Sequence, residues 1–288
     1  MENLWIFYSL AGLIVLWLGD FIKKVVLQRK WDKEVFLFMC FVFYIIILWW
    51  NYLINSNTEI TAIDIKSALI IGSFDFLAPL WTLTALKYLD VSFSLVTIRL
   101  ISSILILIIW MNLLWDSLSF YNLLGFLIWF MAIFSLSGFS FSKKISLHWK
   151  WLLAIFLCII GIVGSHSYFK YVVADLDINN FMIIKFSITF SILIFYMFIR
   201  KKFKNFSYKQ LKIVMPYALV SGIIFSAMFL FIYPKIYLLW PLSLWYKILS
   251  YSLIVPIILS MIIYKDKITK RKAIAFALTM ISLALFIV

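Results

Sequence analysis

The most informative ionisable residue of this sequence is Asp75, which lies near the middle of a long apolar stretch. A charged side chain in such a segment is costly unless it is paired or functional. Pro79 follows four residues later and has no amide hydrogen to donate to the carbonyl group of Asp75. The acid and the interrupted helix would form a polar notch that binds a cation or takes up a proton. The alternative is an ion pair with Arg99 that holds two helices together.

Arg99 and Lys247 also lie deep in apolar stretches, where snorkelling to the membrane interface is difficult. The spacing from Lys87 to Arg99 equals that from Lys235 to Lys247, so an internal repeat would make the two cations equivalent. Together they could clamp a carboxylate or phosphate, because arginine binds it bidentately and lysine as a point charge. The alternatives are a structural ion pair and snorkelling. A surplus of such intramembrane cations favours a ligand with an anionic group.

Aromatic side chains accompany two of these groups. Trp245 and Tyr246 directly precede Lys247, and Trp81 follows Asp75 by six residues. Most aromatic residues of membrane proteins form interfacial belts, and the alternative is a stacking surface for a ring-bearing ligand. The predicted ligand-binding residues are therefore Asp75, Trp81, Arg99, Trp245, Tyr246 and Lys247.

Three residues are candidates for taking up a proton or an ion, namely Asp20, Asp75 and His166. Two lysines follow Asp20 closely, so the alternative for this residue is a local charge pair. Histidine titrates near neutrality, although a single histidine at a helix end is more often interfacial. Lys185 lies only a few residues inside its apolar stretch, and we expect it to snorkel to the outer interface.

Motifs for catalysis and for metal binding are absent from the sequence. It contains no glycine-rich phosphate loop, no His-Glu-x-x-His segment and no nucleophile elbow. Its two histidines and two scattered cysteines do not make a metal site. We therefore expect no catalytic residues, no metal and no cofactor, and we expect that the protein is not an enzyme.

Long apolar stretches must position all of these residues. The chain of 288 residues is 66% hydrophobic and 13% charged, with a mean hydropathy of +1.08. A helix needs about 20 apolar residues to cross a bilayer, and the runs are continuous, which favours helices over a barrel. The sequence predicts an all-α integral membrane protein with ten transmembrane helices at about 4–22, 35–54, 67–86, 91–114, 120–141, 151–169, 179–199, 213–232, 237–263 and 273–288.

Positive charge alternates between the gaps that separate these stretches. Of the 26 lysine and arginine residues, 20 lie in the gaps after the first, third, fifth, seventh and ninth stretches. The positive-inside rule places these gaps in the cytoplasm and both termini on the non-cytoplasmic side of a cell (inner or plasma) membrane. The net charge of +14 is explained by this topology and by anionic lipid, so no nucleic-acid partner is expected.

The two halves of the chain resemble each other. The segment Asp116-Ser-Leu-Ser before the fifth stretch matches Asp266-Lys-Ile-Thr before the tenth at an offset of 150 residues. The predicted halves are 1–145 and 146–288. Because each half holds five helices, an odd number, the second half enters the membrane from the opposite side. Such inverted repeats recur in secondary transporters, whose sites lie between the repeats.

Ten apolar stretches, divided five plus five by these acid-aliphatic-hydroxyl segments, resemble the EamA branch of the drug/metabolite transporter superfamily. The segments Ala85–Ser94 and Gly164–Lys170 also resemble that family. Departures are the aspartate in place of glutamate, a missing proline in the fourth helix and the scarcity of glycine. The resemblance implies a basket with a cavity lined mainly by the first, third, fourth, sixth, eighth and ninth helices, and the fifth and tenth helices outside, where they often mediate dimers.

The expected function is therefore secondary-active transport of a small polar metabolite, such as an amino acid, a carboxylate or a sugar phosphate. The expected partners are this small-molecule substrate and the lipid bilayer, and the chain would act as a monomer or homodimer. The alternatives are a flippase for a lipid-linked sugar and, with less support, a non-transporting intramembrane enzyme.

The charge alternation makes a testable prediction about topology. A reporter that is active only in the cytoplasm should be dark when fused to the C-terminus and bright when fused after Lys204, because the basic gap at 200–212 stays inside. Reporter activity in whole cells measures both positions. The reverse pattern would contradict the orientation.

Overall fold

The computed structural model describes residues 32–55, 59–88, 91–113, 119–136, 149–239 and 270–287, with isolated residues between 8 and 26. Helix makes up 94% of the structure, and the described residues contain no strand, which confirms the all-helical class. The main helices are α2 (Lys33–Asn55), α3 (Ala62–Tyr88), α4 (Val91–Leu113), α5 (Phe120–Leu136), α6 (Trp149–Val172), α7 (Ile178–Ile199), α8 (Tyr208–Ala227), α9 (Tyr233–Leu239) and α12 (Lys270–Ile287).

Seven of the predicted stretches, from 35–54 to 213–232, each contain a helix, and so does the last one. The eighth differs from expectation, because α8 continues through a π-helical turn, η3 (Met228–Ile232), into α9 without a break. Such π turns are often found at functional sites. The first stretch and most of the ninth lie outside the continuous described ranges, so the count of ten helices stays a prediction.

Several helices begin at a polar side chain that accepts hydrogen bonds from the first turn. The carboxylate of Asp32 accepts from the amides of Glu34 and Val35 at the start of α2. Asp177 accepts from the amide of Asn180 at the start of α7. Caps of this kind satisfy amides that have no partner within the helix. The polar gaps of the sequence therefore define where these helices start.

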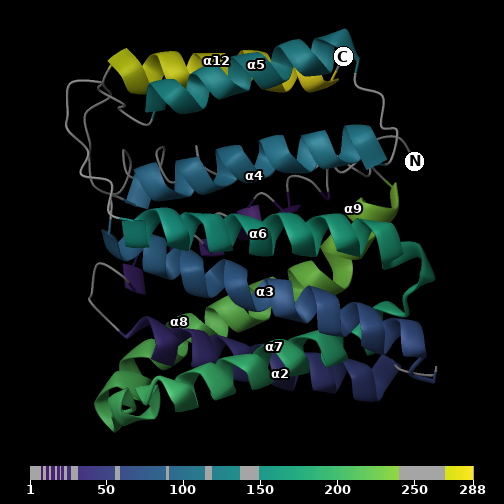
Figure 1. Ribbon diagram of the computed structural model, residues 1–288, viewed down its shortest axis with the longest axis vertical. Coiled ribbons are helices and arrows are strands. Elements are labelled where there is room, and N and C mark those ends of the chain that lie inside the picture. Colours follow the sequence, from purple (N-terminus) through teal and green to yellow (C-terminus); the bar gives the residue numbers. More distant parts are fainter. Residues whose placement is uncertain are drawn as a thin grey trace.

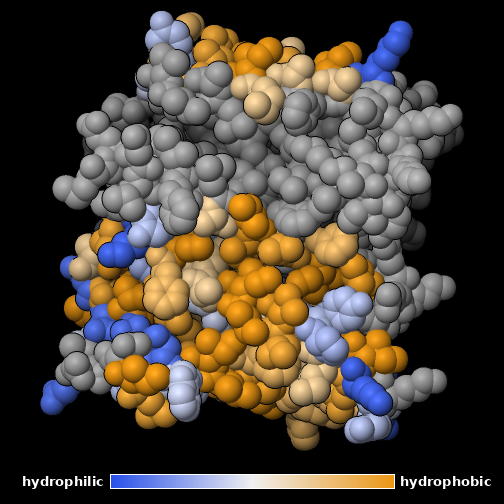
Figure 2. Space-filling view, turned by 180° about the vertical axis from the view of Figure 1, so that it is seen from behind, coloured by the Kyte–Doolittle hydropathy of each residue, from blue (hydrophilic) through white to orange (hydrophobic). Residues whose placement is uncertain are grey.

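Five helical segments are long and apolar enough to cross a membrane, namely Lys33–Ile54, Ala62–Ala85, Trp149–Asp175, Ile178–Ile199 and Gln210–Lys235. Large apolar side chains such as Trp50, Leu53 and Phe198 are exposed on these segments. Figure 2 shows that hydrophobic residues cover the described part of one face. A water-soluble protein would not expose so much apolar surface. The chain is a membrane protein.

Helix α3 lies at the centre of the packing. It contacts α6 and α7 extensively, while α2 packs against α7 and α8, and α4 lies on α6. Helices α5 and α12 pack along each other at one end of the molecule, beyond α4 (Figure 1). The helices that cross near α3 therefore come from both halves of the chain.

Glycines allow the closest of these contacts. A Cβ atom built on Gly72 of α3 would lie 3.0 Å from the carbonyl oxygen of Lys185 and 3.3 Å from the Cγ2 atom of Ile188, both on α7. A Cβ atom on Gly222 of α8 would lie 2.6 Å from the Cβ atom of Phe43 on α2. Small residues let helix backbones approach in membranes, where van der Waals packing drives association. The contacts of α3 with α7 and of α8 with α2 are therefore built alike.

Gly161 on α6 gives a prediction about stability. A Cβ atom there would lie 2.7 Å from the carbonyl oxygen of Phe74 and 2.8 Å from the amide nitrogen of Ala78, both backbone atoms of α3. Gly161→Val should lower the free energy of unfolding by about 1–3 kcal/mol, the usual cost of overpacking. Thermal unfolding in detergent measures the change. Phe156→Leu on the exposed face of the same helix is the matched control, and equal stability of both variants would contradict the contact.

Candidate functional site

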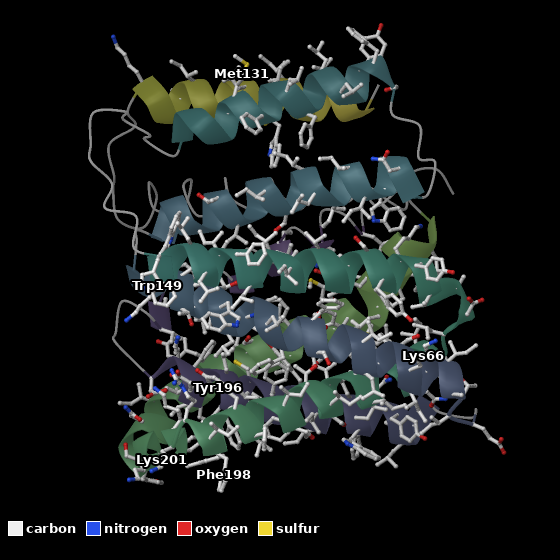
Figure 3. The ribbon with its side chains drawn as sticks, viewed as in Figure 1. Lys66, Met131, Trp149, Tyr196, Phe198 and Lys201 are labelled. Carbon is white, nitrogen blue, oxygen red and sulfur yellow. The ribbon has the colours of Figure 1, made fainter. Side chains whose placement is uncertain are left out.

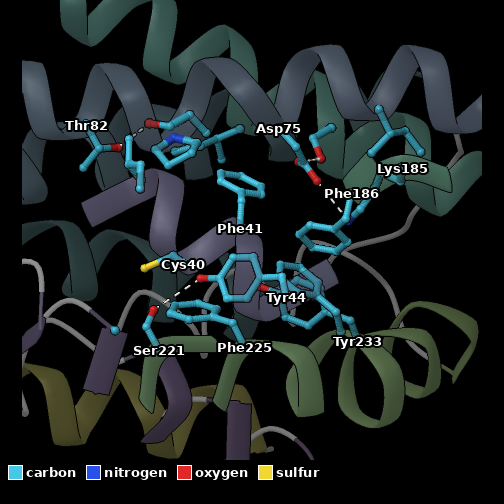
Figure 4. A pocket seen from close by; sticks show the side chains of 18 of the residues that line it. Cys40, Phe41, Tyr44, Asp75, Thr82, Lys185, Phe186, Ser221, Phe225 and Tyr233 are labelled. Carbon is cyan, nitrogen blue, oxygen red and sulfur yellow. Dashed lines mark hydrogen bonds and ion pairs between the residues drawn. The ribbon is translucent and has the colours of Figure 1, made fainter. Parts of the chain in front are cut away.

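A cavity of about 210 Å³ lies between the central helices. Side chains of α2, α3, α6, α7 and α8 line it, together with Ile98 of α4, Phe229 of the π turn and Tyr233 of α9 (Figure 4). Pockets for drug-sized ligands hold about 300–1,000 Å³. The cavity is therefore suited to a small solute.

The polar centre of the cavity is an ion pair between Asp75 of α3 and Lys185 of α7. The Nζ atom of Lys185 lies 2.9 Å from the Oδ2 atom of Asp75, and the two side chains are 4% and 21% exposed, respectively. The hydroxyl group of Ser165 on α6 donates a hydrogen bond to the other carboxylate oxygen, Oδ1. Side chains of two further helices thus hold both oxygens of Asp75.

Aromatic rings surround the ammonium group of Lys185. Its Nζ atom lies 4.2 Å from the ring centroid of Phe186 and 4.4 Å from that of Phe229, with Phe181 at 5.8 Å. A cation near the face of an aromatic ring is stabilised by about 0.5–2 kcal/mol, more when water is excluded. The rings therefore offset part of the cost of burying this charge.

Small residues and hydroxyl groups bring these three helices together. On α6, Gly161 and Gly164 face α3 within one turn of Ser165, so the serine can reach Asp75. On α7, the hydroxyl group of Thr189 hydrogen-bonds to the carbonyl oxygens of Lys185 and of Gly72, which lies on α3 one turn from Asp75. The close approach at Gly72 places Lys185 opposite the acid.

The opposite wall of the cavity is aromatic and hydroxylic. The hydroxyl groups of Tyr44 on α2 and Ser221 on α8 lie 3.3 Å apart and are hydrogen-bonded. Phe41 and Phe225 line the same region, and Figure 4 shows Tyr44, Phe225 and Ser221 across the cavity from Asp75. The site thus combines one charged wall with one uncharged wall.

The structure brings together two of the predicted site residues, Asp75 and His166, which both line the cavity. Trp81 is half-buried against the hydrophobic core and is not among the lining residues, whereas we expected it to face the same space as Asp75. The helix of Arg99 is described as part of α4, but its side chain lies outside the described residues. The remaining predicted residues, Asp20, Trp245, Tyr246 and Lys247, also lie outside them and stay predictions.

The expectation that Lys185 snorkels to the outer interface is wrong. Its side chain is buried and bonded to Asp75. The position of Lys185 near the start of the seventh stretch suggested that it reaches the interface. That position alone could not show that Asp75 lies opposite it on α3. The only sequence signal for this residue was a charge inside the seventh stretch.

Tyr44, Ser165 and Ser221 were not predicted from the sequence. Hydroxyl groups are common in its apolar stretches, so these three residues do not stand out. In addition, helices α2 and α7 line the cavity, although the family resemblance did not place them there.

No protein-family model matches the chain, and no curated protein matches it at a significant level. Solved structures do match it. One, described as "Crystal structure of protein", superposes with a TM-score of 0.68 over 98% of each chain, at 14% sequence identity. At this identity the match shows the shared fold alone.

The ion pair makes a prediction about stability. Lys185→Met should lower the free energy of unfolding by up to about 3 kcal/mol, because it leaves the partly buried carboxylate of Asp75 without its cation. Adding Asp75→Asn should recover most of this loss, since the double variant buries no net charge. Thermal unfolding of the single and double variants in detergent measures the coupling. A double variant as unstable as the Lys185 variant would show that the two residues are not coupled.

Proposed function

We propose that this protein is a secondary-active transporter that carries a small polar metabolite across the membrane by alternating access around the cavity of Asp75 and Lys185. The observation that carries the proposal is a cavity inside a bundle of membrane-spanning helices with a charged pair on its wall. Ionisable groups in such bundles mark substrate or ion pathways, because their burial is costly. A purely structural pair would not need a cavity beside it.

The packing of the helices supports an inverted repeat, as expected for the EamA branch of the drug/metabolite transporters. Gly72 and Gly222 lie 150 positions apart, the same offset as the two acid-aliphatic-hydroxyl segments. Their partners, Ile188 and Phe43, lie on the equivalent helices α7 and α2. In an inverted repeat α3 corresponds to α8 and α7 corresponds to α2. The contact of α3 with α7 would then be equivalent to the contact of α8 with α2. Transporters built in this way rock one half against the other around a site between them.

The positions of the helix ends support the proposed orientation. Figure 3 shows Trp149 and Lys201 at one end of the helices and Lys66 at the other. Near the first end, the ammonium group of Lys202 lies 3.4 Å from the carboxylate of Glu34. The described ends of the first, fifth and seventh gaps, which are rich in lysine and arginine, thus lie at one end, which we assign to the cytoplasm of the inner or plasma membrane.

The size of the cavity favours a small solute over a lipid-linked sugar. A flippase would need a wide polar groove that opens to the lipid. The groove between α3, α4 and α6 is instead lined by apolar residues such as Phe74, Leu105 and Phe156. A small water-soluble metabolite fits the described cavity better.

Counterflow in proteoliposomes tests the proposal. Vesicles are loaded with a mixture of amino acids, carboxylates, sugar phosphates and amines, and the exchange of each solute is measured by mass spectrometry. At least one solute should exchange faster than in protein-free vesicles. Scrambling of a fluorescent lipid without any solute exchange would favour the flippase.

Chemical modification of Cys40 tests whether transport uses the cavity, because this residue lines it. A membrane-permeant thiol reagent should reduce exchange to the protein-free rate, since the added group fills the cavity. The Cys40→Ala variant keeps Cys158 and should resist the reagent. Equal inhibition of both proteins would show that modification of Cys40 is not the cause of the inhibition.

A further inference from the structure

A groove of about 450 Å³ runs along α6 between α3 and α4. The described residues that line it are all apolar, and Leu105, Leu152 and Phe156 on its rim are exposed. The three helices contact one another and lie side by side in Figure 1. In a bilayer, hydrocarbon chains fill an open apolar groove, because close contact with its walls gains van der Waals energy. The groove is distinct from the cavity of Asp75 and Lys185.

The groove has the length of one leaflet of the bilayer. On α6 it extends from Leu152, near the start of the helix, to Gly164, twelve positions later. At the rise of an α-helix this distance is about 18 Å, and half of the hydrocarbon core of a bilayer is about 15 Å thick. Phe74 and Leu105, which line the groove, lie near the middle of α3 and α4. The groove therefore ends at the depth where the acyl chains of one leaflet end.

The residues at the start of α6 suit the headgroup of an anionic lipid. Trp149 is exposed and stands three and seven positions before Leu152 and Phe156, on the same face of the helix. Tryptophan is typical of the membrane interface. The exposed Lys150 adds a positive charge at this end of the helix. Figure 3 shows Trp149 at the end that we assign to the cytoplasm, and the cytoplasmic leaflet contains anionic lipids.

We propose that the groove between α3, α4 and α6 binds one acyl chain of an anionic phospholipid from the cytoplasmic leaflet, whose headgroup lies near Trp149 and Lys150. The acyl chain follows α6 from the interface to the middle of the bilayer. This site goes beyond the proposed function, because it does not depend on which solute is transported. It uses only the orientation that the basic gaps assign.

The bound chain supports a wall that the groove shares with the central cavity. Phe74 and Gly164 line the groove, and the residues that follow them, Asp75 and Ser165, line the cavity and are hydrogen-bonded to each other. A Cβ atom built on Gly164 would lie 2.7 Å from the Cδ1 atom of Phe74, so this ring packs directly on the backbone of α6. A chain in the groove covers this contact from the lipid side, which stabilises the packing of α6 against α3.

Three lipids test the site on the unmodified protein, purified in detergent and freed of bound lipid. They are palmitoyl-oleoyl phosphatidylglycerol, the phosphatidylcholine with the same two chains, and dihexanoyl phosphatidylglycerol. Native mass spectrometry follows the binding of the first lipid molecule during a titration. The long-chain phosphatidylglycerol should bind about fivefold more tightly than the phosphatidylcholine, the usual effect of one basic residue near a membrane surface. It should also raise the melting temperature of the protein.

The dihexanoyl lipid should bind at least about tenfold more weakly than the long-chain lipid with the same headgroup, because its short chains leave most of the groove unfilled. Equal binding of the two long-chain lipids would show that the site does not select an anionic headgroup. Equal binding of the two phosphatidylglycerols would show that no acyl chain lies in the groove. Either result would overturn the inference.

Substitutions inside the groove test where the lipid lies. Ile160→Trp on α6 and Leu105→Trp on α4 each place a larger side chain in the groove, and each should abolish the tight binding of phosphatidylglycerol. Ile46→Trp is the matched control, because Ile46 is exposed on α2 and does not line the groove. Binding that is equally tight in all three variants would place the lipid elsewhere and contradict the proposal.

A substitution at the start of α6 tests the headgroup. Lys150→Gln should lower the affinity for phosphatidylglycerol to that for phosphatidylcholine. Lys66→Gln removes an exposed lysine at the opposite end of the helices and should leave both affinities unchanged. Equal effects of the two substitutions would show that general surface charge attracts the lipid and that Lys150 does not hold its headgroup.

A second copy of the chain is the competing occupant of the groove. If the unmodified protein forms a dimer that Leu105→Trp converts to a monomer, the groove is a protein interface and the lipid inference is wrong. None of these measurements uses a transported solute. Failure of lipid binding therefore leaves the proposed function standing, and failure of solute exchange leaves the lipid site standing.

Discussion

The contact between Asp75 and Lys185 constrains the rest of the structure, because two charges buried among membrane helices must meet. The unpaired charges would each cost several kcal/mol. The 2.9 Å contact requires that α3 and α7 share one depth and face each other at these residues. Ser165 adds the same requirement for α6. Much of the central packing satisfies this one condition.

The helices meet this condition because glycines let α6 and α7 pack closely against α3. Gly72 brings α7 against α3, and Gly161 and Gly164 bring α6 against the other side of α3. In a bilayer the hydrophobic effect does not drive helices together, so tight van der Waals contact and interhelical hydrogen bonds must do so. The hydroxyl group of Thr189, which bonds to a carbonyl oxygen of α3, serves both purposes. Of the eight glycines of this chain, Gly72, Gly161 and Gly164 lie where α7 and α6 approach α3.

Similar packing with different chemistry distinguishes the two halves. Three residues after Gly72 and Gly222, the first half of the chain has Asp75 and the second has Phe225, and both side chains line the cavity. In the proposed transport cycle, similar packing lets the halves exchange roles, while the different walls give the substrate one orientation. The π turn at Met228–Ile232, which follows α8, carries Phe229. The ring of Phe229 lies beside the ammonium group of Lys185, so this irregular turn forms part of the charged wall of the cavity.

The sequence by itself determined the class of the protein, because apolar length and continuity depend only on local composition. The helices from α2 to α8 follow from this pattern, and Asp75 stood out because an acid in an apolar run is expensive. The sequence could not assign its partner. Whether Lys185 reaches the interface or an acid depends on the rotation and depth of α7 against α3. That geometry is decided by contacts such as Gly72 with Ile188, between residues far apart in the chain. The extended helix through the π turn and the aromatic wall of Tyr44 and Phe225 likewise required the tertiary structure, because apolar side chains give no signal in a sequence that is 66% hydrophobic.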